Sequence, residues 1–216
     1  HLSIRRQRQM CIIDSVNEAR VSGGQVNEAL GNMPHARFLP NNPLYYFVRV
    51  KEVFGRFFNA SAVDRAQFDF MISSKRLKEI YLLSQDEQYV KASRLRDDYS
   101  GSLGKNIDQL RKARSQNQEA GPLLDEIVDD LGYQEILIIH LQDSASNEST
   151  QNFDTNYLVQ SFDKYVSNLE QFRPGLKSRF TLLRSDVGMN NETIAPSPSP
   201  AIFVTTDSAK PRRIIY

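Results

Sequence analysis

The chain has 216 residues, which is long enough to bury a substantial core within one or two domains. Its hydrophobic content of 40% and charged content of 25% are ordinary for a globular protein. A formal net charge of +1 excludes a whole-chain electrostatic field that would attract nucleic acid. The absence of Trp, together with only 10 Gly, disfavours an all-β fold with many tight turns.

The first segment, residues 3–21, is predicted to be a helix that begins with a basic cluster. Arg5, Arg6 and Arg8 lie in its first turns. We interpret this cluster as a solvated helix start or as the stub that follows an upstream membrane segment. Binding to phospholipid headgroups is the alternative. No run of about 18 apolar residues follows His1, so we expect any signal peptide or membrane anchor to precede it.

A Gly-Gly pair after residue 22 ends this helix, because glycine adopts the closing backbone conformation at little cost. We assign residues 1–35 to an N-terminal helix and linker, with one short amphipathic turn near its end. Residues 36–43 are predicted to be extended, since Pro40 and Pro43 disfavour helical geometry at the residues that precede them.

Residues 44–58 follow as an aromatic-rich helix. Its apolar side chains recur every three or four residues, which places them on one face. These side chains are Phe47, Val50, Phe54 and Phe57. We expect this face to pack in the core, and we expect Lys51 and Glu52 to lie on the opposite, wetter side. Core packing accounts for so many rings, and a cofactor pocket is the alternative interpretation.

Three longer helices are predicted next, at residues 61–85, 86–117 and 123–143. The first carries a seven-residue apolar rhythm, which is typical of long helices packed side by side at a shallow angle. Its members are Val63, Ala66, Phe70, Leu77 and Ile80. Residues 136–139 read Ile-Leu-Ile-Ile, so we expect them at the centre of the fold. A strand at 135–141 is the alternative, because the run is β-branched.

Residues 153–172 are predicted to form the last long helix, which Pro174 and the following glycine interrupt. Because Leu176, Phe180 and Leu183 continue the phase of this helix, we expect a kink or a restart on the same surface and not a reversal.

We assign residues 36–187 to the helical bundle, and the composition changes after it. Residues 188–216 contain alternating Pro and Ser and are predicted to form an extended tail. Two short pieces of the tail differ from a simple spacer, and we expect them to contact a partner by adding a strand or by lying along its surface. The candidate interaction residues in these pieces are Ile202, Phe203, Val204, Arg212, Arg213 and Tyr216.

The sequence contains no recognisable catalytic or ligand-binding constellation. The three histidines, His1, His35 and His140, are far apart, and none has a ligand-type residue at metal-binding spacing on a helix face. We expect His140 to be a packed, hydrogen-bonded core residue. We therefore predict no catalytic residue, no cofactor and no metal site. An enzyme whose site is assembled from distant residues is the alternative.

Two motifs carry a resemblance to a known family. They are Leu39-Pro40-Asn41-Asn42-Pro43-Leu44-Tyr45, followed by Arg49 and Lys51-Glu52, and Lys75-Arg76-Leu77-Lys78-Glu79. In this order they resemble an uncharacterised bacterial family whose domain opens with a Leu-Pro-x-x-Pro-Leu-Tyr entry into an Arg/Lys-x-Lys-Glu helix. The resemblance covers residues 38–115, about a third of the chain. The chain departs from the usual Lys-Arg-x-Lys-Glu pattern at Val48.

The resemblance implies an all-helical fold that lies outside the cytoplasm, behind a signal peptide or a membrane anchor, and it implies no particular activity. The two motifs also predict a structural pair. We expect Arg76 or Lys75 to pair with Glu52 across the helix hairpin, with a contribution of at most about 1 kcal/mol if the pair is exposed.

The sequence thus predicts an all-α protein, an antiparallel bundle of long helices with an extended C-terminal tail. We expect a non-enzymatic structural or interaction subunit outside the bacterial cytoplasm. Its heptad helix faces and its tail would bind protein partners, a larger assembly or further copies of the chain, and no nucleic acid. A membrane-anchored sensor or regulatory domain is one alternative. A small enzyme or ligand-binding protein with a pocket in the bundle is the other.

Overall fold

The computed structural model describes residues 20–145 and 153–184, and every regular element in these ranges is helical. The elements are α2 Gly23–Asn32, α3 Tyr45–Phe58, α4 Ala62–Gln85, α5 Tyr89–Ser115, α6 Gly121–Ala145, α7 Asn156–Leu169, the 3₁₀ turn η2 Lys177–Arg179 and α8 Thr181–Arg184. The all-α prediction is confirmed, and residues 135–141 are helical, not a strand. The predicted tail at 188–216 and nearly all of the predicted helix at 3–21 lie outside the described residues.

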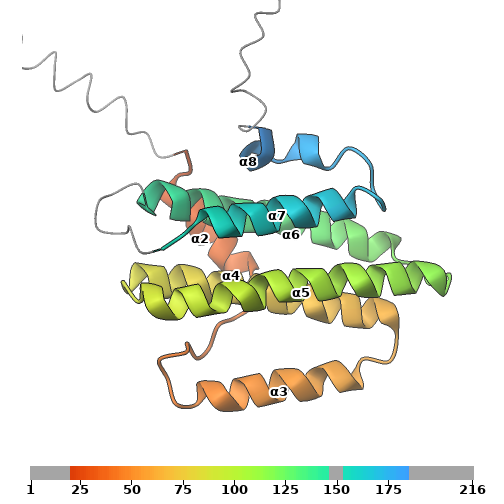
Figure 1. Cartoon of the computed structure of the whole chain (residues 1–216), viewed down its shortest axis with the longest axis horizontal. Helices are drawn as coiled ribbons and strands as arrows, with labels where there is room; N and C mark the ends of the chain where they lie inside the picture. The colour runs from red at the N-terminus through yellow and green to blue at the C-terminus, as the bar shows by residue number, and fades with distance from the viewer. Residues whose placement is uncertain (1–19, 146–152, 185–216) are drawn as a thin grey trace, which may run out of the picture.

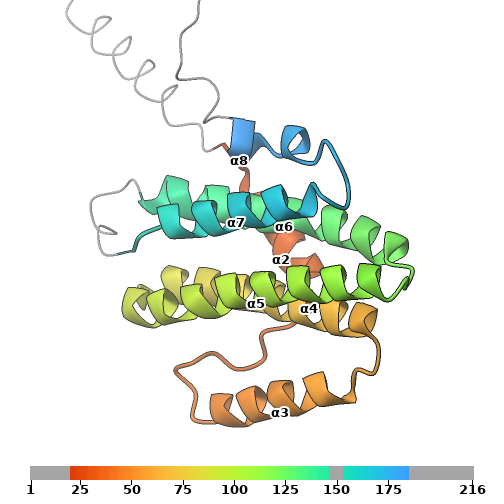
Figure 2. The same ribbon diagram turned by 45° about the vertical axis from the view of Figure 1, so that its right-hand side comes forward.

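The long helices form two stacked layers (Figures 1 and 2). Helices α4 and α5 make an antiparallel hairpin in one layer, and α6 and α7 make the second layer. Helix α2 crosses behind these layers, and the short α8 covers the outer side of the α6–α7 layer. Helix α3 lies alone beyond the α4–α5 layer. The arrangement is the predicted bundle with one helix set apart from it.

Helix α4 begins and ends at residues that satisfy its free backbone groups. The Ser61 hydroxyl accepts a hydrogen bond from the Asp64 backbone N–H at 2.9 Å, and the Asp64 carboxylate accepts one from the Ser61 N–H at 3.4 Å. At the other end, Glu87 has a positive φ of 58°, and the Gln88 N–H donates to the Leu83 carbonyl at 2.8 Å. This tight turn returns the chain into α5.

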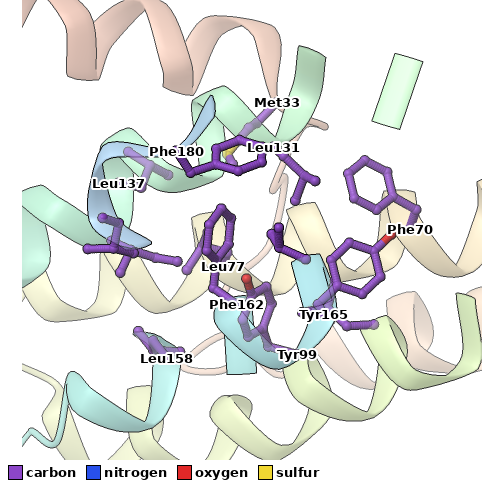
Figure 3. Packing of buried hydrophobic residues seen from close by; sticks show 14 of the residues in the cluster. Met33, Phe70, Leu77, Tyr99, Leu131, Leu137, Leu158, Phe162, Tyr165 and Phe180 are labelled. Carbon is purple, nitrogen blue, oxygen red and sulfur yellow. The ribbon is translucent and has the colours of Figure 1, made fainter. Parts of the chain in front are cut away.

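The core lies between the two layers and is mostly apolar. Figure 3 shows buried side chains that converge there from α4, α5, α6 and α7, among them Leu77, Tyr99, Leu131 and Phe162. Burying one large apolar side chain of this kind stabilises the fold by about 1.5–3 kcal/mol. The bundle therefore depends on contacts between helices more than on the stability of any single helix.

Buried polar side chains fix how the helices are aligned with one another. The Tyr99 hydroxyl of α5 donates to Gln134 Oε1 of α6 at 3.0 Å, and Gln134 Nε2 donates to the Ser74 hydroxyl of α4 at 2.9 Å. In the same way, the Tyr165 hydroxyl of α7 donates to Asn106 Oδ1 of α5 at 2.8 Å. Sliding one helix along another would leave these groups buried without partners, which costs free energy.

The segment assigned from the sequence to a linker is part of the core. Helix α2 is opened by a reciprocal capping interaction between Ser22 and Gln25, and it packs against α6. Val26, Ala29 and Met33 are buried in the same cluster as the rest of the bundle. The boundary predicted at residue 35 therefore does not separate a linker from the bundle. A helix this short carries too few apolar repeats to be distinguished from an isolated turn.

The chain reverses after α7, so the expectation of a continuation without reversal is wrong (Figures 1 and 2). Gly175 has a φ of 86°, a conformation that other residues adopt only with strain. The chain then folds back over the second layer, where Leu176 and Phe180 are buried. The Phe180 ring meets the Phe162 ring edge-on, with 5.4 Å between centroids. The chain after the turn packs on the same layer, so its apolar residues keep the spacing of those in α7. For this reason the spacing of apolar residues in the sequence did not reveal the turn.

Helix α3 contradicts the predicted core face. None of its residues is buried, and Phe47, Phe54 and Phe57 are 67%, 59% and 80% exposed. The prediction that Lys51 and Glu52 both lie on the solvent-exposed side is also wrong in part, because the Glu52 side chain is only 14% exposed and contacts α4. The cause is a set of ion pairs between α3 and the bundle, which apolar spacing alone cannot reveal.

Candidate interaction site at helix α3

Helix α3 is attached to the bundle through its polar face. The side chains on this face recur every three or four residues, so they point in one direction. They are Tyr45, Arg49, Glu52 and Arg56. Arg49 Nη2 donates to Asp98 Oδ2 of α5 at 2.7 Å, and Arg56 Nη2 donates to Asp69 Oδ2 of α4 at 3.0 Å. These two ion pairs hold α3 at points about two helical turns apart.

The central attachment joins Glu52 to two adjacent cations of α4. Lys75 Nζ donates to Glu52 Oε1 at 2.5 Å, and Arg76 Nη2 donates to Glu52 Oε2. Arg76 Nη1 also donates to Glu79 Oε2 at 2.6 Å, and the Tyr45 hydroxyl donates to the same oxygen at 2.9 Å. We call these five side chains the ion-pair network.

The ion-pair network is largely removed from water. The Arg76 and Glu79 side chains are fully buried, and Lys75 is only 13% exposed. Burying charge costs free energy, which the mutual attraction offsets only when hydrogen bonds accompany it. Two carboxylates and two cations neutralise each other here. Arg76 Nε and Glu79 Oε1 nevertheless have no hydrogen-bond partner among the described residues.

Burial and charge shift the protonation equilibria within the ion-pair network. Burial raises the pKa of Glu79, and the neighbouring Arg76 opposes that rise. Burial alone would lower the pKa of Arg76, but the Glu79 and Glu52 carboxylates outweigh it, so that pKa is raised. Burial and the Glu79 carboxylate raise the pKa of the Tyr45 hydroxyl well above its ordinary value. Arg76 therefore stays charged, and Tyr45 stays a neutral hydrogen-bond donor.

The structure brings together the residues of the pair predicted from the two motifs. Glu52 accepts hydrogen bonds from both Lys75 and Arg76. The pair is not a surface pair, because Arg76 is fully buried, so the small contribution expected of an exposed pair does not apply. Both Glu79 and Tyr45 belong to the two motifs, but the predicted pair did not include them. The spacing of Glu79 three residues after Arg76 is the signal that could have indicated the first of them.

One exposed side of α3, about a quarter turn around the helix from the ion-paired side, is apolar. Its outer face consists of Tyr46, Val53 and Phe57, which are 71%, 61% and 80% exposed. Exposed side chains of this size in one contiguous strip are unusual on a protein that acts alone, and such strips mark interaction surfaces.

An apolar groove of about 790 Å³ lies between α3, α4 and the segment that precedes α3. Its apolar lining includes Phe38, Val48, Phe54, Phe68, Met71 and Ile72. The helices come close at Gly55, where an added Cβ would lie 3.2 Å from the Phe68 ring. A larger residue at position 55 would have to displace that ring. Glycine therefore sets the spacing of the two helices there.

Basic side chains also line this groove. Arg37, Lys51 and Lys75 contribute cations, and the one carboxylate among the lining residues is Glu52. Because Lys75 and Arg76 already neutralise Glu52, the charge left over in the groove is positive. The arrangement can hold an apolar body beside a negative group.

Among the three histidines, His35 and His140 lie within the described residues. His35 lines the groove. The His140 ring packs against Tyr81 at 5.6 Å between centroids, but its Nδ1 has no hydrogen-bond partner among the described residues, so the expected hydrogen bond is missing there. The six candidate interaction residues between positions 202 and 216 lie outside the described residues.

Across residues 20–145 and 153–184, no group of three or more His, Cys, Asp or Glu side chains is placed to hold a metal ion. No helix there combines the length and apolar character that crossing a bilayer requires. Comparison with protein-family models, with curated proteins and with solved structures finds no match to this chain. The family resemblance of residues 38–115 stays a prediction.

Proposed function

We propose that the protein is a non-enzymatic interaction subunit that binds a protein partner through the outer face of α3. The observation that supports this proposal is the inverted orientation of the helix, whose charged side faces the bundle while its aromatic side faces water. Burying one such side chain against a partner is worth about 1.5–3 kcal/mol. Aromatic residues are also enriched among the side chains that dominate binding energy at interfaces.

The attachment of α3 suits a docking surface that is formed before the partner arrives. The helix is held at Arg49, Glu52 and Arg56, which are spread along its length. A helix that is already held loses little conformational freedom when it binds, which favours affinity. The outer face would therefore be presented to a partner as a rigid strip.

The location and the assembly are part of the same proposal. The family resemblance supports a place outside the cytoplasm of a bacterium, and the seven-residue rhythm of α4 supports coiled-coil-like packing. The partner would be another subunit or a further copy of the chain, and the tail residues at 202–204 and 212–216 would extend the contact. A membrane-anchored sensor or regulatory domain is the other function that such a surface would suit.

Affinity isolation from the native source tests the proposal. The wild-type chain is compared with the double variant Tyr46→Asp/Phe57→Asp and with the control Val90→Asp, which changes a residue of α5 that is 70% exposed. We expect a partner that co-purifies with the wild type and the control but is lost from the double variant. A solitary monomer in sedimentation analysis, with identical recoveries for all three proteins, would overturn the proposal.

A further inference from the structure

The groove between α3 and α4 has the size of a small-molecule site. Its volume of about 790 Å³ falls within the range of roughly 300–1,000 Å³ that is typical of ligand pockets. Phe68, Met71 and Ile72 line it from α4, and Val48 lines it from α3. Such a lining favours one ligand with an extended apolar body.

The charges in the groove specify the other end of that ligand. Arg37 and Lys51 both line the groove, both are exposed, and neither forms an ion pair with another described residue. Lys51 emerges from the same side of α3 as Val48 and Gly55, so its ammonium group stands next to the apolar lining. A cation beside an apolar wall attracts a negative group that is joined to an apolar body.

The ion pairs keep the groove from collapsing. The polar face of α3 is bound to Lys75, Arg76 and Asp98, so the helix cannot roll its aromatic side onto α4 without breaking those contacts. At Gly55 the two helices already approach as closely as the Phe68 ring allows, and this close approach limits the groove. A pre-formed groove of limited length fits one small molecule with an extended apolar chain better than it fits a whole helix of a partner protein.

We propose that this groove is a binding site for an anionic amphiphile, a molecule with one long apolar chain and a carboxylate or comparable anionic headgroup. The apolar chain lies along Val48, Met71 and Ile72, and the headgroup lies at Arg37 and Lys51. The site uses different residues from the outer face of α3, so it goes beyond the proposed protein docking.

Calorimetric titration with three amphiphiles that each carry a chain of about twelve carbons tests the site, with each probe kept below its micelle concentration or its solubility limit. The probes are dodecanoate, dodecanol and dodecyltrimethylammonium, which share a chain and differ in headgroup charge. We expect saturable binding of one dodecanoate per protein chain, with an affinity about tenfold higher than that of dodecanol. One charge-assisted hydrogen bond to the carboxylate accounts for a difference of this size. The cationic probe should bind most weakly.

Variants then locate the site. Lys51→Glu should weaken dodecanoate binding by about tenfold or more, because it replaces an attraction with a repulsion. Met71→Trp starts from a residue that is 39% exposed and should block the groove without a loss of helical circular dichroism. Arg179→Glu makes the same charge change in η2, on the other side of the bundle, and should leave binding unchanged.

Several results would overturn the proposal. They are equal binding of all three probes, absence of saturable binding, and equal loss in Lys51→Glu and Arg179→Glu. Sedimentation of the protein with phosphatidylglycerol vesicles, without binding of monomeric dodecanoate, would show a membrane-binding surface instead. The Tyr46→Asp/Phe57→Asp variant should still bind dodecanoate, so loss of partner docking and loss of ligand binding are separate outcomes.

Discussion

Arg76 and Glu79 lie one helical turn apart on α4, both fully buried, with Arg76 Nη1 2.6 Å from Glu79 Oε2. The same guanidinium donates to Glu52 of α3. Arg76 therefore serves two carboxylates from two helices. It is also among the largest fully buried side chains of the described bundle. Removing this buried cation would leave both Glu79 and Glu52 without the hydrogen bond and the compensating charge that it provides.

Replacing Arg76 alone should destabilise the protein strongly. Arg76→Met leaves Glu79 without its cation in a fully buried position, and we expect a loss of about 3–5 kcal/mol in the free energy of unfolding. The double variant Arg76→Met/Glu79→Gln should recover part of the loss, because no buried charge remains unpaired. Urea denaturation of both variants measures this. Arg111→Met, which breaks a surface pair with Asp108, is the control and should cost no more than about 1 kcal/mol.

The rings of α3 should contribute little to folding, in contrast to rings of the core. Phe57 is 80% exposed, so Phe57→Ala should change the free energy of unfolding by no more than about 0.5 kcal/mol. Phe162 is fully buried, and Phe162→Ala should cost about 3–5 kcal/mol. Thermal and urea unfolding compare the two variants directly. Equal losses would mean that α3 packs its aromatic face inward, as its apolar spacing alone suggested.

A buried amide joins three helices and should be sensitive to truncation. Asn106 Nδ2 donates to the Ala66 carbonyl at 2.7 Å, and its Oδ1 accepts from the Tyr165 hydroxyl at 2.8 Å. Asn106→Ala removes both contacts and leaves the hydroxyl and the carbonyl buried without these partners, at an expected cost of about 2–3 kcal/mol. Asn156→Ala, at an exposed position at the start of α7, is the matched control. A similar unfolding midpoint for both variants would show that the buried contacts carry no stability.

Two core tyrosines should make the fold sensitive to alkali. Burial raises the pKa of Tyr99 and Tyr165 far above the ordinary value of 10.0, so neither phenol ionises in the folded protein. Because the pKa of each phenol is higher in the folded state than in the unfolded state, unfolding becomes easier when the unfolded phenols can ionise. The contribution of these tyrosines to stability is therefore fully present below pH 10.0 and is lost as the pH rises above it. We therefore expect the melting temperature to fall steeply above about pH 10, with phenolate absorbance of these residues appearing only on unfolding.

The variant Tyr99→Phe tests the origin of that pH dependence. It loses the hydrogen bond to Gln134, so it should melt lower than the wild type at pH 8. Its melting temperature should nevertheless fall less between pH 9 and pH 11, because one fewer phenol must stay protonated. Parallel curves for the two proteins over that range would assign the alkaline sensitivity to other groups.

Much of the fold follows from local patterns that the sequence alone carries. Ser61 and Asp64 mark the start of α4, and the structure begins that helix at Ala62. The Ile-Leu-Ile-Ile run at 136–139 is helical and mostly buried, as its composition indicates. Caps and apolar spacing act within a few residues, so they can be recognised without knowledge of the rest of the molecule.

The orientation of α3 was decided only by the tertiary structure. The sequence of the helix has one charged side and one aromatic side, and either could in principle face inward. The choice depends on Lys75, Arg76 and Asp98, which lie 23 to 49 positions further along the chain and form the surface that α3 meets. Local spacing contains no information about that surface, because charge complementarity between helices exists only after both are placed. The exposed aromatic strip and the groove beside it follow from that complementarity.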